Sequence, residues 1–232
     1  INGNKCFVTN AGAGIECCVL GFFREPSGLA CALVPSSSPG FHLAHRYLFA
    51  GWEGLPNHAL VLQDCTVPAD HLVAGPLAPG ELERWCDACR ILVSAAACGM
   101  SRACMDEAVR YASERKQFGK KLSEHQALYF RLADMAVSTT LIRAFLSLAA
   151  SRVDAGYPCH AEACMLKLFA TGKLEEAASS AMEMAGAYGY TVDSGLSRLY
   201  RDAKGLQLLW GTREMMRREI ASALMGAGGG NE

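Results

Sequence analysis

The most reactive side chains in this sequence belong to its eleven cysteines. Cys86 and Cys89 form a Cys-x-x-Cys pair and Cys17 and Cys18 are adjacent, but no second pair follows at the spacing of a zinc ribbon or zinc finger. An odd cysteine count in a chain of this length also does not fit a small secreted disulfide scaffold. We therefore expect reduced thiols in small buried side chains, and no metal site.

A second feature is the tryptophan in the stretch LQLLWGTREMMRR, residues 206–218. Trp210 occupies a glycine-containing turn just before the last predicted helix, where turns usually carry small polar residues or chemistry. The role of such a bulky aromatic side chain depends on the helices and strands that surround the turn.

The charge balance excludes some classes of partner. The chain has 232 residues, with 22 Lys and Arg against 23 Asp and Glu. No broad positive field is available for nucleic acid or an anionic membrane. We expect no apolar run to reach the length of a membrane span, and nothing resembles a signal peptide, which predicts a cytoplasmic location. The first residue is Ile1 rather than Met, so we expect the chain to begin inside a longer polypeptide.

The first third of the sequence has the pattern of short strands separated by turns. Apolar stretches such as CCVLGFF, LACALVP and HALVLQDCTVP are separated by glycine and proline, and Asn2-Gly3 predicts a type I′ hairpin turn. We interpret residues 1–76 as a small antiparallel β domain.

Long helical stretches follow. Ala, Leu, Met, Glu and Arg with apolar residues at spacings of three and four predict helices near 80–114, 122–155, 159–187 and 213–225. Ser123 and Gln126 have the spacing of a capping box at the start of the second helix. Residues 77–226 are therefore predicted to form an antiparallel four-helix bundle, residues 227–232 a flexible tail, and the whole chain an α+β fold.

Four ordered motifs resemble the acyl-CoA dehydrogenase family: INGNKCFVTNAG (1–12), YASERKQFGKKLSEHQ (111–126), AGAYGYTVDSGLSRLYRDAK (185–204) and GTREMMRREIA (211–221). The resemblance implies a flavoprotein that binds FAD between a β domain and a four-helix bundle. It also implies an N-terminal helical domain that this chain lacks. Members usually assemble as tetramers, so we expect a homo-oligomer, either a dimer or a tetramer, in which a neighbour completes the FAD site.

The same resemblance assigns FAD contacts. Phe7 matches the aromatic residue that stacks on the flavin ring, and Thr9 the hydroxyl that bonds its edge. Arg115 matches the arginine that contacts the pyrophosphate, although the Glu-Arg-Lys run at 114–116 is also typical of a solvated helix end. The further cofactor positions implied are Phe118, Gln126, Glu183, Gly186, Ala187 and Thr212.

Two of these positions depart from the family pattern. Glu183 stands where the family generally has Gln, and Ala187 where it has Gly. Glu183 keeps an acceptor, loses the amide donor and adds negative charge, which weakens the expectation of tight FAD binding.

The catalytic base is also absent from both places where the family puts it. Most members have a Glu before the Gly-Thr of the last loop, which is Trp210 here, and a minority have it on the first bundle helix, which is Cys89 here. A Cys89 thiolate is conceivable because Arg90 is adjacent, but an ordinary buried thiol is the simpler interpretation. We expect Asp87, Arg90 and Trp210 to line the substrate side.

The loop near the substrate differs as well. Glu53 and Leu55 replace residues that are often Arg and Ser in the family, and His58 follows as a second candidate base or a solvated loop histidine. We therefore expect FAD-dependent oxidation of an unusual acyl thioester on CoA or an acyl carrier protein, including hydroxyacyl groups, as in polyketide extender-unit biosynthesis. Electrons would pass to an acceptor flavoprotein. The alternatives are a flavin monooxygenase that uses oxygen, and a non-catalytic partner subunit.

Overall fold

The computed structural model of the chain describes residues 1–12, 18–26, 28–78 and 80–226. These residues form two compact units, Ile1–Leu82 and Glu83–Glu232. The predicted tail, 227–232, lies outside the described residues. The domain boundary predicted after residue 76 stays a prediction.

The first unit consists of two three-stranded antiparallel sheets. One sheet has the order β1-β5-β4, with β1 at Gly3–Thr9, β5 at Asn57–Leu62 and β4 at Phe41–Tyr47. The other has the order β2-β3-β6, with β2 at Cys18–Glu25, β3 at Gly28–Pro35 and β6 at Leu72–Ala74. A short 3₁₀ helix, η1, spans Ala69–His71. The core of this unit contains Val34, Phe41, Leu60 and Cys65.

Two local predictions for this unit were wrong, and one strand was missed. Asn2-Gly3 is not a hairpin turn, because Gly3 begins β1 and the Asn2 side chain exchanges hydrogen bonds with Asp64 at 2.6 and 3.0 Å. Strand β4 was missed, and His58 lies within β5 rather than in a loop.

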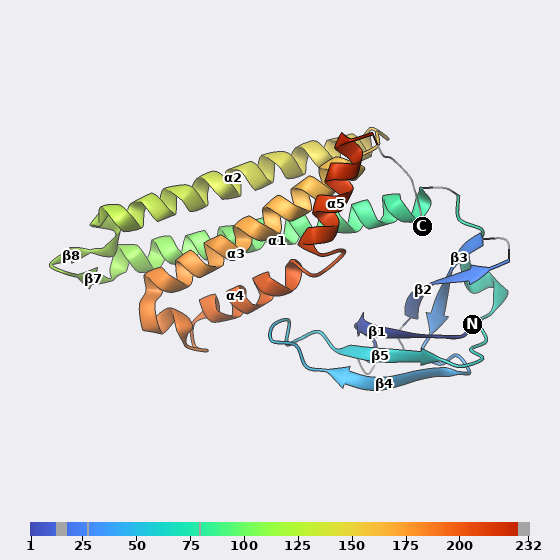
Figure 1. The fold of residues 1–232 in the computed structure, drawn as a ribbon. Coiled ribbons are helices and arrows are strands. Elements are labelled where there is room, and N and C mark those ends of the chain that lie inside the picture. Colours follow the sequence, from blue (N-terminus) through green and yellow to red (C-terminus); the bar gives the residue numbers. More distant parts are fainter. Residues whose placement is uncertain (13–17, 27, 79, 227–232) are drawn as a thin grey trace. The chain divides into compact units, whose positions relative to one another are not determined.

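The second unit is helical (Figure 1). Its helices are α1 (Glu81–Glu114), α2 (Gln126–Asp154), α3 (His160–Tyr190), α4 (Gly195–Leu206) and α5 (Arg213–Leu224). A small hairpin joins α1 to α2 through β7 (Lys116–Gln117), β8 (Lys120–Lys121) and the 3₁₀ turn η2 (Leu122–Glu124). The α+β fold class is thus confirmed.

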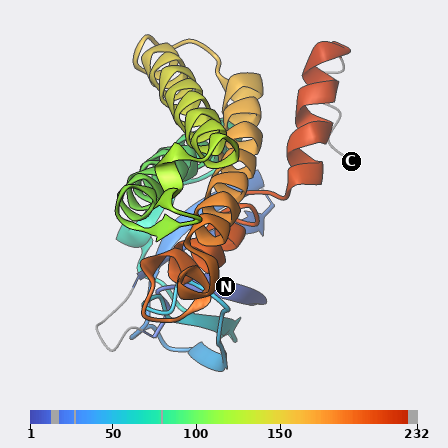
Figure 2. The ribbon, with the colours of Figure 1, turned by 90° about the vertical axis from the view of Figure 1, so that its left-hand side faces the viewer.

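Helix α3 occupies the centre of this unit. It contacts α2, α4 and α5, and Figure 2 shows α5 on the side of α3 away from α2. Its buried face is built from small and aliphatic residues that let neighbouring helices approach closely, namely Ala163, Leu166, Ala170, Leu174, Ala177, Ala178 and Ala181.

The helix starts differ from the predicted ones in two places. The predicted Ser123–Gln126 capping box is absent, because α2 begins at Gln126 after His125 and Ser123 lies in η2. Helix α4 was not predicted, although Ser194 caps it by accepting a hydrogen bond from the Leu196 N–H at 3.2 Å.

Two helices are apolar enough to qualify as membrane spans by length and composition. The most apolar stretches of α1 and α2 reach mean hydropathies of 1.2 and 1.4, with 33% and 17% of each stretch buried. The expectation that no apolar run approaches span length was therefore wrong. Bundle helices of soluble proteins pass the same test, so this finding alone does not assign the chain to a membrane.

Candidate active site

The β unit presents an aromatic platform around Phe7. Strand β1 changes register against β5 between Lys5 and Val8, and Phe7 has a φ of 58° at this irregularity. The residue is 61% exposed, and its ring centroid lies 4.4 Å from that of Tyr47. A bulge that turns a large aromatic outward is suited to receiving a flat ligand.

The neighbouring Thr9 is oriented by a polar partner. Its hydroxyl donates a hydrogen bond to the Asn57 Oδ1 atom at 3.0 Å, and Asn57 is buried. Thr9 therefore has a fixed side chain beside Phe7, but donation to a flavin would need its hydroxyl hydrogen to turn away from Asn57.

Three further cofactor positions lie at the end of the helical unit where α1 and α2 meet. Arg115 follows α1 and is exposed, Phe118 is 92% exposed with a φ of 52°, and Gln126 is the first residue of α2. Among the described residues, the Phe118 ring pairs with one other ring, that of His125. The two rings meet edge to face, with centroids 6.2 Å apart. A cation and a bare aromatic ring on one hairpin fit a large anionic, aromatic ligand.

The charge of Glu183 is balanced within the fold. Its Oε2 atom accepts from the Arg131 Nη1 group at 2.7 Å, and its Oε1 atom accepts from the Ser179 hydroxyl at 3.2 Å. The added negative charge at this predicted FAD position therefore has a cationic partner on α2.

A backbone kink follows close by in α3. Gly186 has φ 60° and ψ −143°, a conformation that side chains strongly disfavour, and both Gly186 and Ala187 are exposed. The kink opens the helix backbone where the family resemblance places the adenosine half of FAD.

The residues predicted for the substrate side do come together. Buried Arg90 donates from Nη1 to Asp87 Oδ1 at 2.7 Å and from Nε to the Trp210 carbonyl at 3.4 Å. Burial raises the Asp87 pKa, and nearby His160 and Arg90 oppose this shift. The loop that contains Trp210 is therefore hydrogen-bonded to α1 through Arg90.

A second cation, Lys167 on α3, binds the same loop. The Lys167 ammonium is fully buried and donates to the Gln207 carbonyl at 2.7 Å and to the Gly211 carbonyl. Burial, together with nearby Arg90, lowers the Lys167 pKa to about 8. Thr212 then begins α5 by capping it, its hydroxyl accepting from the Met215 N–H at 3.4 Å.

No carboxylate occupies either base position. Trp210 is 44% exposed, and its backbone has a φ of 54°. Cys89 is half-buried, and burial raises the pKa of its thiol. A thiol that holds its proton is a poor base for a C–H bond.

The other candidate base, His58, belongs to the β unit. It is half-buried in β5, and its Nδ1 atom is buried without a hydrogen-bond partner in the described part of the chain. Glu53 and Leu55 are both exposed in the segment before β5.

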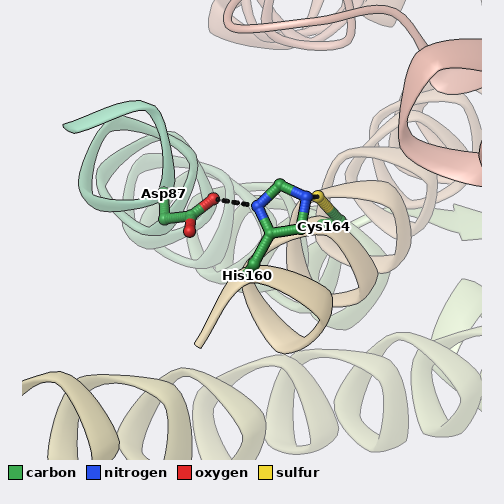
Figure 3. A group of neighbouring side chains, drawn as sticks. All are labelled: Asp87, His160 and Cys164. Atoms are coloured by element: carbon green, nitrogen blue, oxygen red, sulfur yellow. Dashed lines mark hydrogen bonds and ion pairs between the residues drawn. The ribbon is translucent and has the colours of Figure 1, made fainter. Parts of the chain in front are cut away.

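The sequence prediction missed a group of side chains next to Arg90. His160 at the start of α3 places its Nδ1 atom 3.0 Å from Asp87 Oδ1 and its Nε2 atom 4.0 Å from the Cys164 Sγ atom (Figure 3). The His-x-x-x-Cys spacing at 160–164 was visible in the sequence, since residues four apart share one helix face. Nothing in the sequence placed Asp87 against them.

Comparison with known proteins identifies the family. Residues 84–225 match the family model described as acyl-CoA dehydrogenase, C-terminal domain, and the chain belongs to the acyl-CoA dehydrogenase family. It is 36% identical over 230 residues to a probable acyl-CoA dehydrogenase, YngJ, of Bacillus subtilis, and 35% identical over 233 residues to an acryloyl-CoA reductase (NADH) of Anaerotignum propionicum.

Solved structures agree with this assignment. Butyryl-CoA dehydrogenase from Megasphaera elsdenii superposes with a TM-score of 0.87 at 29% identity, and the prolyl acyl carrier protein oxidase AnaB with a TM-score of 0.88 at 26% identity. The matches cover 96–97% of this chain but only 58–60% of those four relatives.

Proposed function

We propose that this chain forms the flavin- and substrate-binding part of an FAD-dependent oxidoreductase that acts on an unusual acyl thioester. One observation carries the proposal. Arg90 and Lys167 hold the loop of residues 207–211 in place, yet the loop presents the Trp210 indole where the family has a carboxylate. The loop is held in place while the family's carboxylate is replaced. This combination favours a changed reaction over a loss of enzymatic activity.

The residues present fit FAD. Exposed Phe7 and Phe118 offer aromatic surfaces, Arg115 offers a guanidinium for a pyrophosphate, and the Gly186 kink leaves the backbone open. The Arg131–Glu183 ion pair offsets the charge that would repel the cofactor. When bound, FAD supplies a hydride acceptor, and the chain orients it and the substrate.

The missing base favours a substrate with an acidic proton. Removing the α-proton of a saturated acyl thioester needs a positioned carboxylate, whereas a hydroxyl proton is far more acidic than an α-C–H. In a hydroxyacyl thioester the carbinol carbon gives up a hydride and the hydroxyl gives its proton to water or a weak base, which yields a ketoacyl product. The likeness to a prolyl acyl carrier protein oxidase supports a carrier-bound thioester, on an acyl carrier protein or CoA.

Stopped-flow mixing of the purified intact protein with thioesters under nitrogen tests the proposal. We expect hydroxyacyl thioesters to bleach the flavin and to yield the ketoacyl product, with the carrier-bound form reacting at least as fast as the CoA form. Failure of a full thioester panel to bleach a bound flavin would overturn it. Oxygen consumption driven by a flavin reductase would instead identify a monooxygenase, and a protein that stays colourless after FAD addition would identify a non-catalytic subunit.

A further inference from the structure

Four potential metal ligands from three helices surround the ring of His160, which is itself a fifth. Helix α1 provides Glu83 and Asp87, α3 provides His160 and Cys164, and α5 provides Glu219. Each of the first two pairs is spaced four residues apart, so both members lie on one helix face. One ligand atom each from Asp87, His160 and Cys164 lies within 4.8 Å of the others.

The Nε2 side of the ring has the spacing of a metal site. The Nε2 atom lies 4.0 Å from the Cys164 Sγ atom and 3.6 Å from the Glu219 Oε2 atom. With zinc bonds of about 2.0–2.3 Å, tetrahedral N and S ligands lie about 3.5 Å apart and N and O ligands about 3.4 Å apart. The two distances to Nε2 exceed these values by about 0.5 and 0.2 Å. Glu219 would also have to move toward Cys164, because the ligand atoms that lie within 4.8 Å of one another belong to Asp87, His160 and Cys164.

The Nδ1 side has the support that a metal-bound histidine usually receives. Asp87 Oδ1 and Glu83 Oε1 both lie 3.0 Å from Nδ1. A carboxylate on the far nitrogen fixes the tautomer and the ring orientation, which leaves Nε2 free to bind metal. Arg90 Nη1 lies 2.7 Å from Asp87 Oδ1 and 3.5 Å from Nδ1, so it holds this carboxylate beside Nδ1.

We propose that His160 Nε2, Cys164 Sγ and a Glu219 carboxylate oxygen bind a divalent cation of the zinc class, with Asp87 positioning the imidazole. The ring is 25% exposed, which leaves room for water as a fourth ligand. The cation would join α3 to α5 and, through Asp87, to α1. This proposal does not depend on the proposed function. Zinc-finger spacing in the sequence does not detect such a site, because its ligands come from separate helices.

The charges around the ring are compatible with a cation. Three carboxylates (Glu83, Asp87 and Glu219) face Arg90 and Lys167 on the elements packed there. Glu219 also pairs through Oε1 with Arg218 at 2.7 Å, so Oε2 is the oxygen that faces the ring. Cys164 is fully buried, and burial raises its thiol pKa to about 11. A metal ion would have to displace this proton, as it does in other thiolate sites.

Cobalt(II) is the probe that tests the site, because a bound thiolate gives it a characteristic charge-transfer absorption. The intact protein is stripped with a chelator and titrated with Co²⁺ and then Zn²⁺. We expect one equivalent of Co²⁺ to produce the thiolate band and Zn²⁺ to abolish it. Absence of the band at stoichiometric Co²⁺ in the wild type would overturn the proposal.

Variants assign the ligands. Cys164→Ala should remove the band, while Cys104→Ala, which removes another fully buried thiol on α1, should leave it unchanged. If Cys164→Ala fails to fold, the half-buried ligand variant Glu219→Gln serves instead and should weaken Co²⁺ affinity by at least tenfold. Asp87→Asn should weaken affinity by about 10–100-fold and keep the band. An unchanged band in Cys164→Ala, or unchanged affinity in Glu219→Gln, would contradict the assignment.

Discussion

Trp210 is the residue at which the family pattern and this chain differ most in chemistry. Its backbone carbonyl accepts from Arg90 and the following Gly211 carbonyl accepts from Lys167, so side chains from α1 and α3 both hold the loop. The indole cannot accept a proton from carbon. At position 210 a loop held by two side chains therefore carries a side chain that cannot act as the base.

A single substitution at this position should not restore ordinary dehydrogenation. Trp210→Glu would place a carboxylate on a positive-φ backbone, while Glu53 and Leu55 would still occupy the places of the family's Arg and Ser. We expect no measurable oxidation of saturated acyl-CoA in a dye-reduction assay. Clear acyl-CoA dehydrogenation by this variant would contradict our account of the pocket, and Trp85→Glu, an exposed change on α1, is the matched control.

Lys167 should make stability depend on pH in the alkaline range. Its pKa is about 8 in the folded chain against an ordinary 10.5, so the unfolded chain binds more protons between these values. The Lys167 contribution is therefore least favourable below about pH 8 and grows as the pH rises to about 10.5. A neutral amine keeps two N–H donors, which match the carbonyls of Gln207 and Gly211.

Urea unfolding of the wild type and Lys167→Met checks this expectation. The variant should lose about 1–3 kcal/mol through the unpaired carbonyls. The difference from wild type should widen between about pH 8 and 10, because only the wild type gains stability there. The buried cysteines have raised pKa values, so they lower the free energy of unfolding as the pH rises. Subtracting the variant's free energy of unfolding from that of the wild type removes this contribution. A difference independent of pH would show that Lys167 is charged throughout.

At the scale of elements, periodicity predicted the long helices well. Helices α1, α3 and α5 begin within one or two residues of the predicted positions because apolar spacing and turn residues agree there. Helix α4 was missed because it contains two glycines, Gly195 and Gly205, which lower its intrinsic helix propensity, and it packs against α3. Strand β4 likewise depends on its pairing with β5, and the sequence alone does not reveal that pairing.

The kink in α3 gives a prediction at this scale. Gly186→Ala should destabilise the chain by about 1–3 kcal/mol, because its dihedral angles are almost exclusive to glycine. A Cβ added at this position would meet no atom of another element within 4 Å, so the cost would come from the backbone rather than from a clash. Chemical denaturation measures the change.

Gly195→Ala is the matched control for that measurement. Its added Cβ would also meet no such atom within 4 Å, but Gly195 has no positive φ, so the change should be neutral or stabilise by about 0.4–1 kcal/mol. Equal effects at the two positions would argue against backbone strain at Gly186.

At the scale of the whole molecule, much apolar surface is exposed on α2. Leu141 and Leu148 are more than half exposed, as are Phe130 and Val137. Such a surface usually meets a partner, and the family resemblance predicted a dimer or tetramer. Sedimentation of the intact protein should show an oligomer, and Val137→Glu should shift it toward monomer while Arg102→Glu, on an already polar face, should not. A wild-type monomer at micromolar concentration would contradict this.

Family motifs predicted the fold and the grouping of Asp87, Arg90 and Trp210, because these follow from short ordered stretches of sequence. The histidine-centred cluster could not be predicted, because its members come from three helices whose packing the sequence does not specify residue by residue. The same limit applies to the Arg131–Glu183 pair, which lies 52 positions apart.

We propose that a flavin pocket is retained while its reaction has changed, and an anaerobic absorption titration of the intact protein tests this proposal most directly. We expect an oxidised-flavin spectrum that saturated acyl-CoA leaves unbleached and that a hydroxyacyl thioester bleaches. Rapid bleaching by a saturated acyl-CoA would contradict it, because neither Trp210 nor Cys89 provides the carboxylate which that reaction requires.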